Sequence, residues 1–309
     1  MSDDNNEKRA AVFPMFLMGG LFVVIHLLSM LIMQPFEAQN LSAFENPDDP
    51  TNIIIFFIIM LAVTVTILLI AKFWKKRFIQ VIILSSIAYT SFFVFYPLMA
   101  FLFPYATIAT VLSMVASAIL VLALLKYPEW YVINLCGIIV GVGAIGLFGI
   151  SLSVFLVIIL LIGLAVYDAI SVYQTKHMID LADAVMDLKL PVMLVVPKKR
   201  QYSMLKQTKG LKEKIEEKEE REAFFMGLGD IVMPGILVAS SFYTIPENGF
   251  LIALSVMIGT LVGFAVLMSV VIKGKPQAGL PYLCSGAILG YVISSLLLTG
   301  GLTGLALPF

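Results

Sequence analysis

The chain has 309 residues, of which 60% are hydrophobic and 13% charged, and its formal net charge is zero. A soluble domain carries about a quarter charged residues and about half apolar ones, so a mean hydropathy of +1.01 excludes an ordinary water-soluble fold. The balanced charge, with a pI near 6.7, argues against a nucleic-acid partner. Cys136 and Cys284 lie inside apolar segments with no neighbouring ligand pattern, which argues against a disulfide framework or a metal site.

The apolar residues form continuous blocks rather than an alternating pattern. Roughly 20 apolar residues in a helix cross a bilayer core of about 30 Å. Nine such blocks can be placed, at residues 12–33, 53–71, 78–100, 105–125, 131–150, 152–176, 223–243, 249–272 and 281–305. The sequence therefore predicts an all-α polytopic membrane protein with nine transmembrane helices.

The basic residues orient these helices. All 20 Lys and Arg residues lie before the first helix or in every second connection after it. The alternate connections (34–52, 101–104, 151 and 244–248) and the C-terminal end contain none. Because cytoplasmic loops collect Lys and Arg, the pattern predicts a cytoplasmic N-terminus and an external C-terminus.

The chain divides into three parts of one integrated membrane domain. Residues 1–176 hold six helices, residues 177–222 form the one long cytoplasmic loop, and residues 223–309 hold three helices. Within the loop, the charged run 211–221 is typical of a solvated linker. The run 192–196 is apolar and rich in Val, which favours an extended strand.

Two acidic residues lie inside the predicted helices. Asp168 is eight residues before Lys176, and Asp230 is nine residues after Arg221. At 1.5 Å per residue, both lie roughly 12–14 Å from the cytoplasmic ends of their helices. An intramembrane carboxylate is costly and marks a functional site by default, so the two acids are expected to face each other at one level.

Two facing carboxylates allow more than one kind of chemistry. In a low dielectric both cannot ionise at once, so they share a proton. One ionised and one protonated carboxyl can activate water and protonate a carbonyl oxygen, as in aspartic proteases. The same pair can also serve as a proton or cation site of a transporter or channel, or as a structural hydrogen-bonded pair.

The residues around the acids narrow this choice. Tyr167 precedes Asp168, and Asp230 ends the sequence Gly227-Leu228-Gly229-Asp230. The glycines allow substrate or backbone to approach the acid closely. Pro234 lacks the N–H that would bond the carbonyl of Asp230, which loosens the helix there.

These motifs, Tyr-Asp in the sixth helix and Gly-Leu-Gly-Asp in the seventh, resemble those of the GxGD intramembrane aspartyl proteases. That family comprises the presenilins, the signal peptide peptidases and archaeal presenilin homologues. Its third motif, Pro-Ala-Leu before the ninth helix, is represented by Ala278-Gly279-Leu280-Pro281, which departs from it at the first two positions. The segment from Gly227 to Ile236, and Gln277, look more like a signal peptide peptidase, whereas the predicted orientation resembles that of presenilins.

The resemblance implies an aspartic endopeptidase that cleaves transmembrane segments without a metal or organic cofactor. Asp168 and Asp230 would be catalytic, and the active-site lining would comprise Tyr167, Gly227, Leu228, Gly229, Ala278, Gly279, Leu280 and Pro281. The substrates would be single-span membrane proteins or peptides in the lipid bilayer. The protein would be a multi-pass protein of the cell membrane, with no nucleic-acid partner.

Substrate binding suggests a role for the loop. A helical peptide bond must unwind before it can be cut, and we expect the run 192–196 to pair with the unwound segment by strand addition. Transport remains the alternative function for the acid pair, although no internal repeat is visible and both acids lie away from the midplane.

Three smaller features also carry expectations. His26 is expected to be a packed, hydrogen-bonded residue, and Asn134 to join neighbouring elements. Gly137 with Gly141, and Gly259 with Gly263, have the GxxxG spacing of closely packed helices, with a homo-oligomer as the alternative use.

Overall fold

The computed structural model describes residues 2–73, 76–175, 193–198, 202–204, 223–271 and 277–305. Most of the predicted loop 177–222, including the charged run 211–221, lies outside these residues. His177 and Pro191 also fall outside them.

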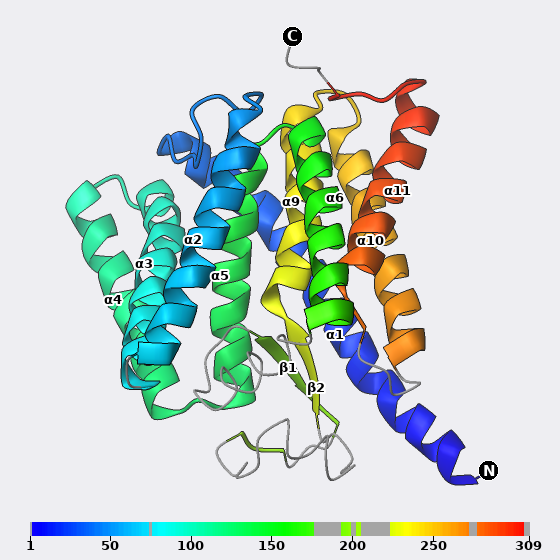
Figure 1. Cartoon of the computed structure of the whole chain (residues 1–309). Helices are drawn as coiled ribbons and strands as arrows, with labels where there is room; N and C mark the ends of the chain where they lie inside the picture. The colour runs from blue at the N-terminus through cyan, green and yellow to red at the C-terminus, as the bar shows by residue number, and fades with distance from the viewer. Residues whose placement is uncertain are drawn as a thin grey trace.

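The described residues form nine α-helices, one in each of the nine predicted apolar segments. They are α1 (Ser2–Ala38), α2 (Thr51–Phe73), α3 (Lys76–Leu102), α4 (Ala106–Lys126), α5 (Trp130–Ser151), α6 (Val154–Ile170), α9 (Leu228–Thr244), α10 (Gly249–Val271) and α11 (Leu280–Thr299). They pack as one bundle (Figure 1). Among the described residues, seven helices are long and apolar enough to cross a membrane, while α9 and the Thr51–Thr66 part of α2 are shorter apolar segments.

Five predicted helix ends differ from the structure by five residues or more. α1 begins at Ser2 rather than at residue 12, and α11 ends at Thr299 rather than at residue 305. α1 continues to Ala38, past the predicted end at residue 33, with Pro35 inside it. The sixth α-helix ends at Ile170 and continues as one turn of π-helix, η1 (Ser171–Thr175). The seventh was expected from residue 223, but residues 223–227 form a strand and α9 begins at Leu228. The last two differences both lie close to the predicted acidic residues.

A two-stranded antiparallel sheet lies at one end of the bundle (Figure 1). Strand β1 (Met193–Pro197) pairs with β2 (Ala223–Gly227), and Val195 lies opposite Phe225. The strand expected within residues 192–196 is therefore present over its described part. Its partner was missed because the sequence Ala-Phe-Phe-Met-Gly continues directly into an apolar helix and shows no alternation that would separate a strand from it.

The N-terminal end of α5 holds this sheet in place. The side-chain amide of Asn134 donates to the Val195 carbonyl and accepts from the Val195 N–H, both at 2.8 Å. Gly137 leaves room for Leu194, since a Cβ there would lie 2.8 Å from the Leu194 side chain. Just before α5, Glu129 accepts bonds from the Ser203 hydroxyl and the Met204 N–H at 2.6 and 3.1 Å. Asn134 thus joins two elements as expected, and the described loop segments are anchored to α5.

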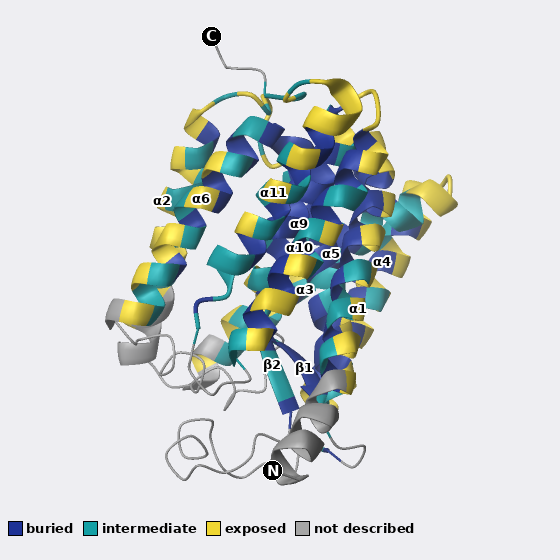
Figure 2. Ribbon diagram, turned by 90° about the vertical axis from the view of Figure 1, so that its right-hand side faces the viewer, coloured by how far each residue is buried: buried dark blue, intermediate teal, exposed yellow. Residues whose placement is uncertain are grey.

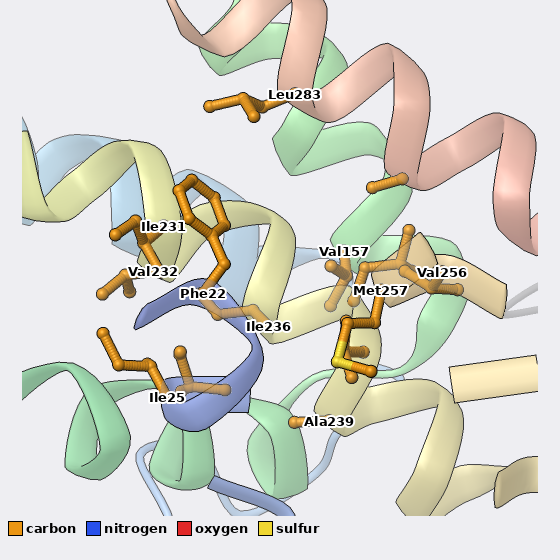
Figure 3. Packing of buried hydrophobic residues seen from close by; sticks show 14 of the residues in the cluster. Phe22, Ile25, Val157, Ile231, Val232, Ile236, Ala239, Val256, Met257 and Leu283 are labelled. Carbon is orange, nitrogen blue, oxygen red and sulfur yellow. The ribbon is translucent and has the colours of Figure 1, made fainter. Parts of the chain in front are cut away.

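Helix α9 occupies the centre of the bundle. Eleven of its 17 residues are buried, and it packs against α1, α5, α6, α10 and α11. Figure 2 shows this buried centre surrounded by helices whose outward faces are exposed. Phe22 of α1 points in among Ile231 and Ile236 of α9 (Figure 3). The second acidic residue is therefore carried by the most enclosed helix.

Helices α10 and α11 approach each other at backbone distance. A Cβ at Gly259 would overlap the Gly286 carbonyl, and a Cβ at Gly263 would overlap the Tyr282 carbonyl. The close packing expected from this GxxxG spacing is present. Gly141 likewise lies under Leu228 and Ile25. Both motifs are used inside the chain, so neither offers a free face for a homodimer.

We expect Gly259→Val to destabilise the protein, because its Cβ meets the backbone of Gly286, which cannot move aside as a flexible side chain could. Overpacking of this kind costs about 1–3 kcal/mol. The matched control is Gly20→Ala, since a Cβ on Gly20 has nothing within 4 Å. Thermal unfolding in detergent would measure both, and equal melting temperatures for the two variants would contradict the predicted backbone contact.

Candidate active site

The two intramembrane acids lie at the ends of α6 and α9 that face the sheet. Asp168 is two residues before the end of α6, and Asp230 is in the first turn of α9. The side chain of Asp168 is 4% exposed. Both carboxylates lie against residues 279–280 at the start of α11. The structure thus brings together the two acids that the sequence placed at one depth.

The segment before α11 lies against both carboxylates. The N–H of Leu280 donates to Oδ2 of Asp168 at 3.1 Å, and the Gly279 amide also interacts with Asp168. On the other side, a Cβ built on Gly279 would lie 3.1–3.2 Å from the carboxylate atoms of Asp230. Residues 279–280 therefore bridge the two acids. A glycine at position 279 allows the Asp230 carboxylate to approach the backbone this closely.

The other expected lining residues lie at different distances from the acids. A Cβ on Gly227 would lie 3.3 Å from Oδ2 of Asp230. Ala278 is fully buried, and Pro281 lies in the first turn of α11. Leu228 packs toward α5.

Two further predicted residues are more exposed. The side chain of Tyr167 is 51% exposed on α6, and Gly229 is exposed on α9 with nothing within 4 Å of a built Cβ. Among the described residues, no hydrogen bond joins the Tyr167 hydroxyl to either acid.

Two side chains near the acids were not selected from the sequence. The Tyr173 hydroxyl donates to Oε1 of Gln277 at 2.8 Å, which joins η1 to the segment before α11. Cys284, one turn into α11, is a buried free thiol. Gln277 belongs to the motif segment before α11. Tyr173 is five residues beyond Asp168, and this spacing matches no pattern that would predict a role at the site. Within the described ranges, no three His, Cys, Asp or Glu side chains are arranged to hold a metal ion.

We expect Gly279→Val to lower activity at least tenfold, because a branched Cβ must displace the Asp230 carboxylate. The measurement is kcat on a single-span substrate in detergent. Gly301→Val is the control, since a Cβ at Gly301 meets nothing within 4 Å. Full activity of the Gly279 variant would contradict the close approach of Asp230 to residue 279.

The chain is similar to known proteins over most of its length. A family model described as signal-peptide peptidase, presenilin aspartyl protease matches residues 19–300. A solved structure of a presenilin family intramembrane aspartate protease is similar with a TM-score of 0.70 and 33% identity, over 92% of this chain and 99% of that one. A second crystal form of such a protease gives a TM-score of 0.67 and 34% identity, over 91% and 96%. No curated protein matches the chain.

The family match covers most of the chain, including both acidic motifs and the start of α11, and the structural match extends over nearly the whole bundle. Nothing in these comparisons supports the transporter alternative. The chain belongs to the signal peptide peptidase and presenilin family of aspartyl proteases, and it is an intramembrane aspartic endopeptidase.

Proposed function

We propose that Asp168 and Asp230 are the catalytic dyad and that they cleave peptide bonds in the transmembrane segments of membrane proteins. The observation that supports this is the bridging of both carboxylates by residues 279–280. Gly227, Leu228, Gly229, Ala278 and Pro281, with Tyr167 on the exposed side of α6, line the cleft around them. No cofactor takes part in the proposed reaction.

The hydrogen bond to Asp168 favours different protonation states for the two acids before the reaction begins. The Leu280 N–H points at Oδ2 of Asp168, and an amide donor stabilises negative charge on the oxygen that it contacts. We therefore assign the base to Asp168 and the shared proton to Asp230. Asp168 removes a proton from water, which attacks the substrate carbonyl carbon, while Asp230 donates its proton to the carbonyl oxygen. Collapse of the tetrahedral intermediate, with proton transfer to the amide nitrogen, breaks the peptide bond.

The expected result for Asp168→Asn and Asp230→Asn is loss of cleavage, each by at least a hundredfold in kcat, because neither amide can take the place of the base or the acid. The purified variants are assayed on a single-span substrate, and mass spectrometry locates the product ends. Asp49→Asn is the control, since Asp49 is an exposed carboxylate that accepts bonds from Thr51 at the start of α2. Cleavage by either dyad variant at the wild-type rate would refute the assignment.

The substrate strand is expected on β2 rather than on residues 192–196. One edge of β1 is paired with β2, and the backbone of Val195 on its other edge is bonded to Asn134. A substrate segment that paired with β1 at Val195 would have to displace β2 or Asn134, which is why we place it on β2 instead. Among the described residues, β2 has no strand on its other side.

The hydrogen bonding of Val195 also fixes which groups of β2 face outward. Since the N–H and C=O of Val195 point at Asn134, Val195 and Phe225 form a pair without mutual hydrogen bonds. The N–H and C=O of Phe225 then point away from β1, and so does the N–H of Gly227, two residues on, whose C=O belongs to the first turn of α9. Gly227 contacts Asp230, so a substrate segment paired with this edge lies beside the dyad.

Phe225→Pro is expected to raise KM severalfold while leaving the sheet intact. Proline lacks the outward N–H but is tolerated on an edge strand where that N–H bonds no neighbouring strand. Phe225→Val keeps the N–H and controls for loss of the ring. If Phe225→Pro cleaves with the KM of Phe225→Val, the edge of β2 is not the substrate site.

We further propose nine membrane spans with a cytoplasmic N-terminus, an external C-terminus and the loop 177–222 in the cytoplasm. The distribution of Lys and Arg supports this, and so does the placement of the start of α1 and of the sheet at one end, with residues 300–305 at the other (Figure 1). In this orientation the dyad lies toward the cytoplasmic side. Residues 1–176 and 223–309 then form one integrated domain of a cell-membrane protein whose single-span substrates have external N-termini.

A further inference from the structure

His26 of α1 is buried in the centre of the bundle and bonded to the helix that carries Asp230. Its side chain is fully buried, and Phe22 packs on it edge-to-face with ring centroids 6.0 Å apart. Nε2 lies 3.1 Å from the backbone carbonyl oxygen of Ile231. A carbonyl oxygen only accepts, so Nε2 carries the proton and donates to it. His26 thus links α1 to the residue that directly follows Asp230.

Helix α9 has a gap that fits this ring. A Cβ on Gly235 would lie 2.9 Å from both Cδ2 and Nε2 of His26, and 2.6 Å from Cδ1 of Ile145. Glycine in a helix interior is unfavourable relative to alanine, so its presence here needs a compensating contact. That contact is the close approach of the His26 ring to α9.

The Ile231 carbonyl, which His26 bonds, is next to a carbonyl of α9 that lacks its own helical hydrogen bond. Pro234 has no N–H, so the carbonyl of Asp230 loses its bond within the helix. The N–H groups of the first turn also have no partner within the helix. Asp230 is therefore held by an incompletely bonded turn, and the bond from His26 attaches the adjacent peptide to α1.

Packing alone does not explain a histidine at this position. Nδ1 is buried, and none of the described residues donates to it. A buried polar atom without a partner is unfavourable, and an apolar side chain of similar size would avoid it. The feature that an apolar side chain could not supply is the donor at Nε2.

We propose that His26 is a positioning residue for Asp230: its Nε2–H holds the Ile231 carbonyl and so keeps the Asp230 carboxylate opposite Asp168. The inference rests on the proposed dyad. It predicts that loss of the donor lowers kcat more than it changes KM, because the acid is misplaced while the β2 edge is unaffected.

The activity test compares three replacements at position 26. His26→Leu removes the donor, and His26→Asn carries an amide that is too short to reach as far as Nε2. His26→Gln places an amide nitrogen near the position of Nε2. We expect at least a tenfold loss of kcat with Leu and Asn, and recovery to within a few fold of wild type with Gln. Ser29→Ala is the matched control, since the buried Ser29 hydroxyl bonds only along α1, to the His26 carbonyl.

Gly235→Ala gives a second, independent arm. All members of the cycle carry Ile145→Val, because Cδ1 of Ile145 also lies close to the new Cβ. In this background the Cβ of Gly235→Ala should displace the imidazole and lower kcat like His26→Leu. When His26→Ala is added, there is no ring to displace, and Gly235→Ala should cost little more. Additive losses in this double-mutant cycle would overturn the proposal. Wild-type kcat for His26→Leu, or equal kcat for Leu and Gln, would also overturn it.

The tautomer of His26 provides a test that depends neither on activity nor on replacing His26 itself. The chain has two histidines, so His177→Gln leaves His26 as the single imidazole. Nitrogen-15 NMR of that protein should show Nε2 protonated and Nδ1 bare, and a proton on Nδ1 with a bare Nε2 would overturn the proposal. A different result would contradict the proposed dyad, namely that Asp168→Asn or Asp230→Asn retains cleavage. The two proposals can therefore fail independently.

Discussion

Two carboxylates inside a bilayer are the constraint on which the rest of this structure depends. Each costs about 2.5–3.5 kcal/mol at the centre of a membrane helix, and two close together repel each other. The protein places Asp168 where the backbone amides of Gly279 and Leu280 can reach it. It also removes side chains beside Asp230 at Gly227 and Gly279, which brings backbone rather than lipid into contact with the acid. The surroundings of the proposed catalytic acids thus include several main-chain groups.

The irregular backbone of the bundle is concentrated around the acids for the same reason. The π-helix η1, strand β2 and the segment 277–279 each begin or end within five residues of Asp168, Asp230 or the bonded N–H of Leu280. Non-helical backbone at membrane depth is tolerated where protein buries it or where it lines an aqueous cavity. α9 has 17 residues and is about 26 Å long, so it falls short of a bilayer core of about 30 Å. Strand β2 directly precedes α9 and extends this segment by five residues, and in the proposed function its outward N–H groups face the substrate.

Much of this could be predicted from the sequence, because the signals are local. Helix positions follow from the length of apolar runs, and the pairing of Asp168 with Asp230 follows from equal distances to the charged ends of their helices. The fold of residues 223–227 could not be predicted this way, since a short apolar run is compatible with strand or helix until its partner is known. The roles of Asn134 and His26 depend on contacts 61 and 205 residues away, which no local pattern encodes.

The two acids are supported unequally. Asp230 lies on α9, which is enclosed on all sides and bonded to α1, while its neighbour Gly279 precedes a helix fixed to α10 by backbone contact. Asp168 lies on α6, whose outward face is exposed at Ile162, Val166 and Ile170. The polar contacts that hold the inner end of α6 to α11 are the bond from Leu280 and the bond between Tyr173 and Gln277. The bond between Tyr173 and Gln277 is exposed, whereas the bond from Leu280 reaches the buried carboxylate of Asp168. The other face of α6 is buried in the apolar core, at Leu160 and Leu164 among others. In the proposed dyad, Asp230 with residues 279–280 is therefore carried by the more enclosed elements of the bundle, and Asp168 by the helix that is exposed along one face.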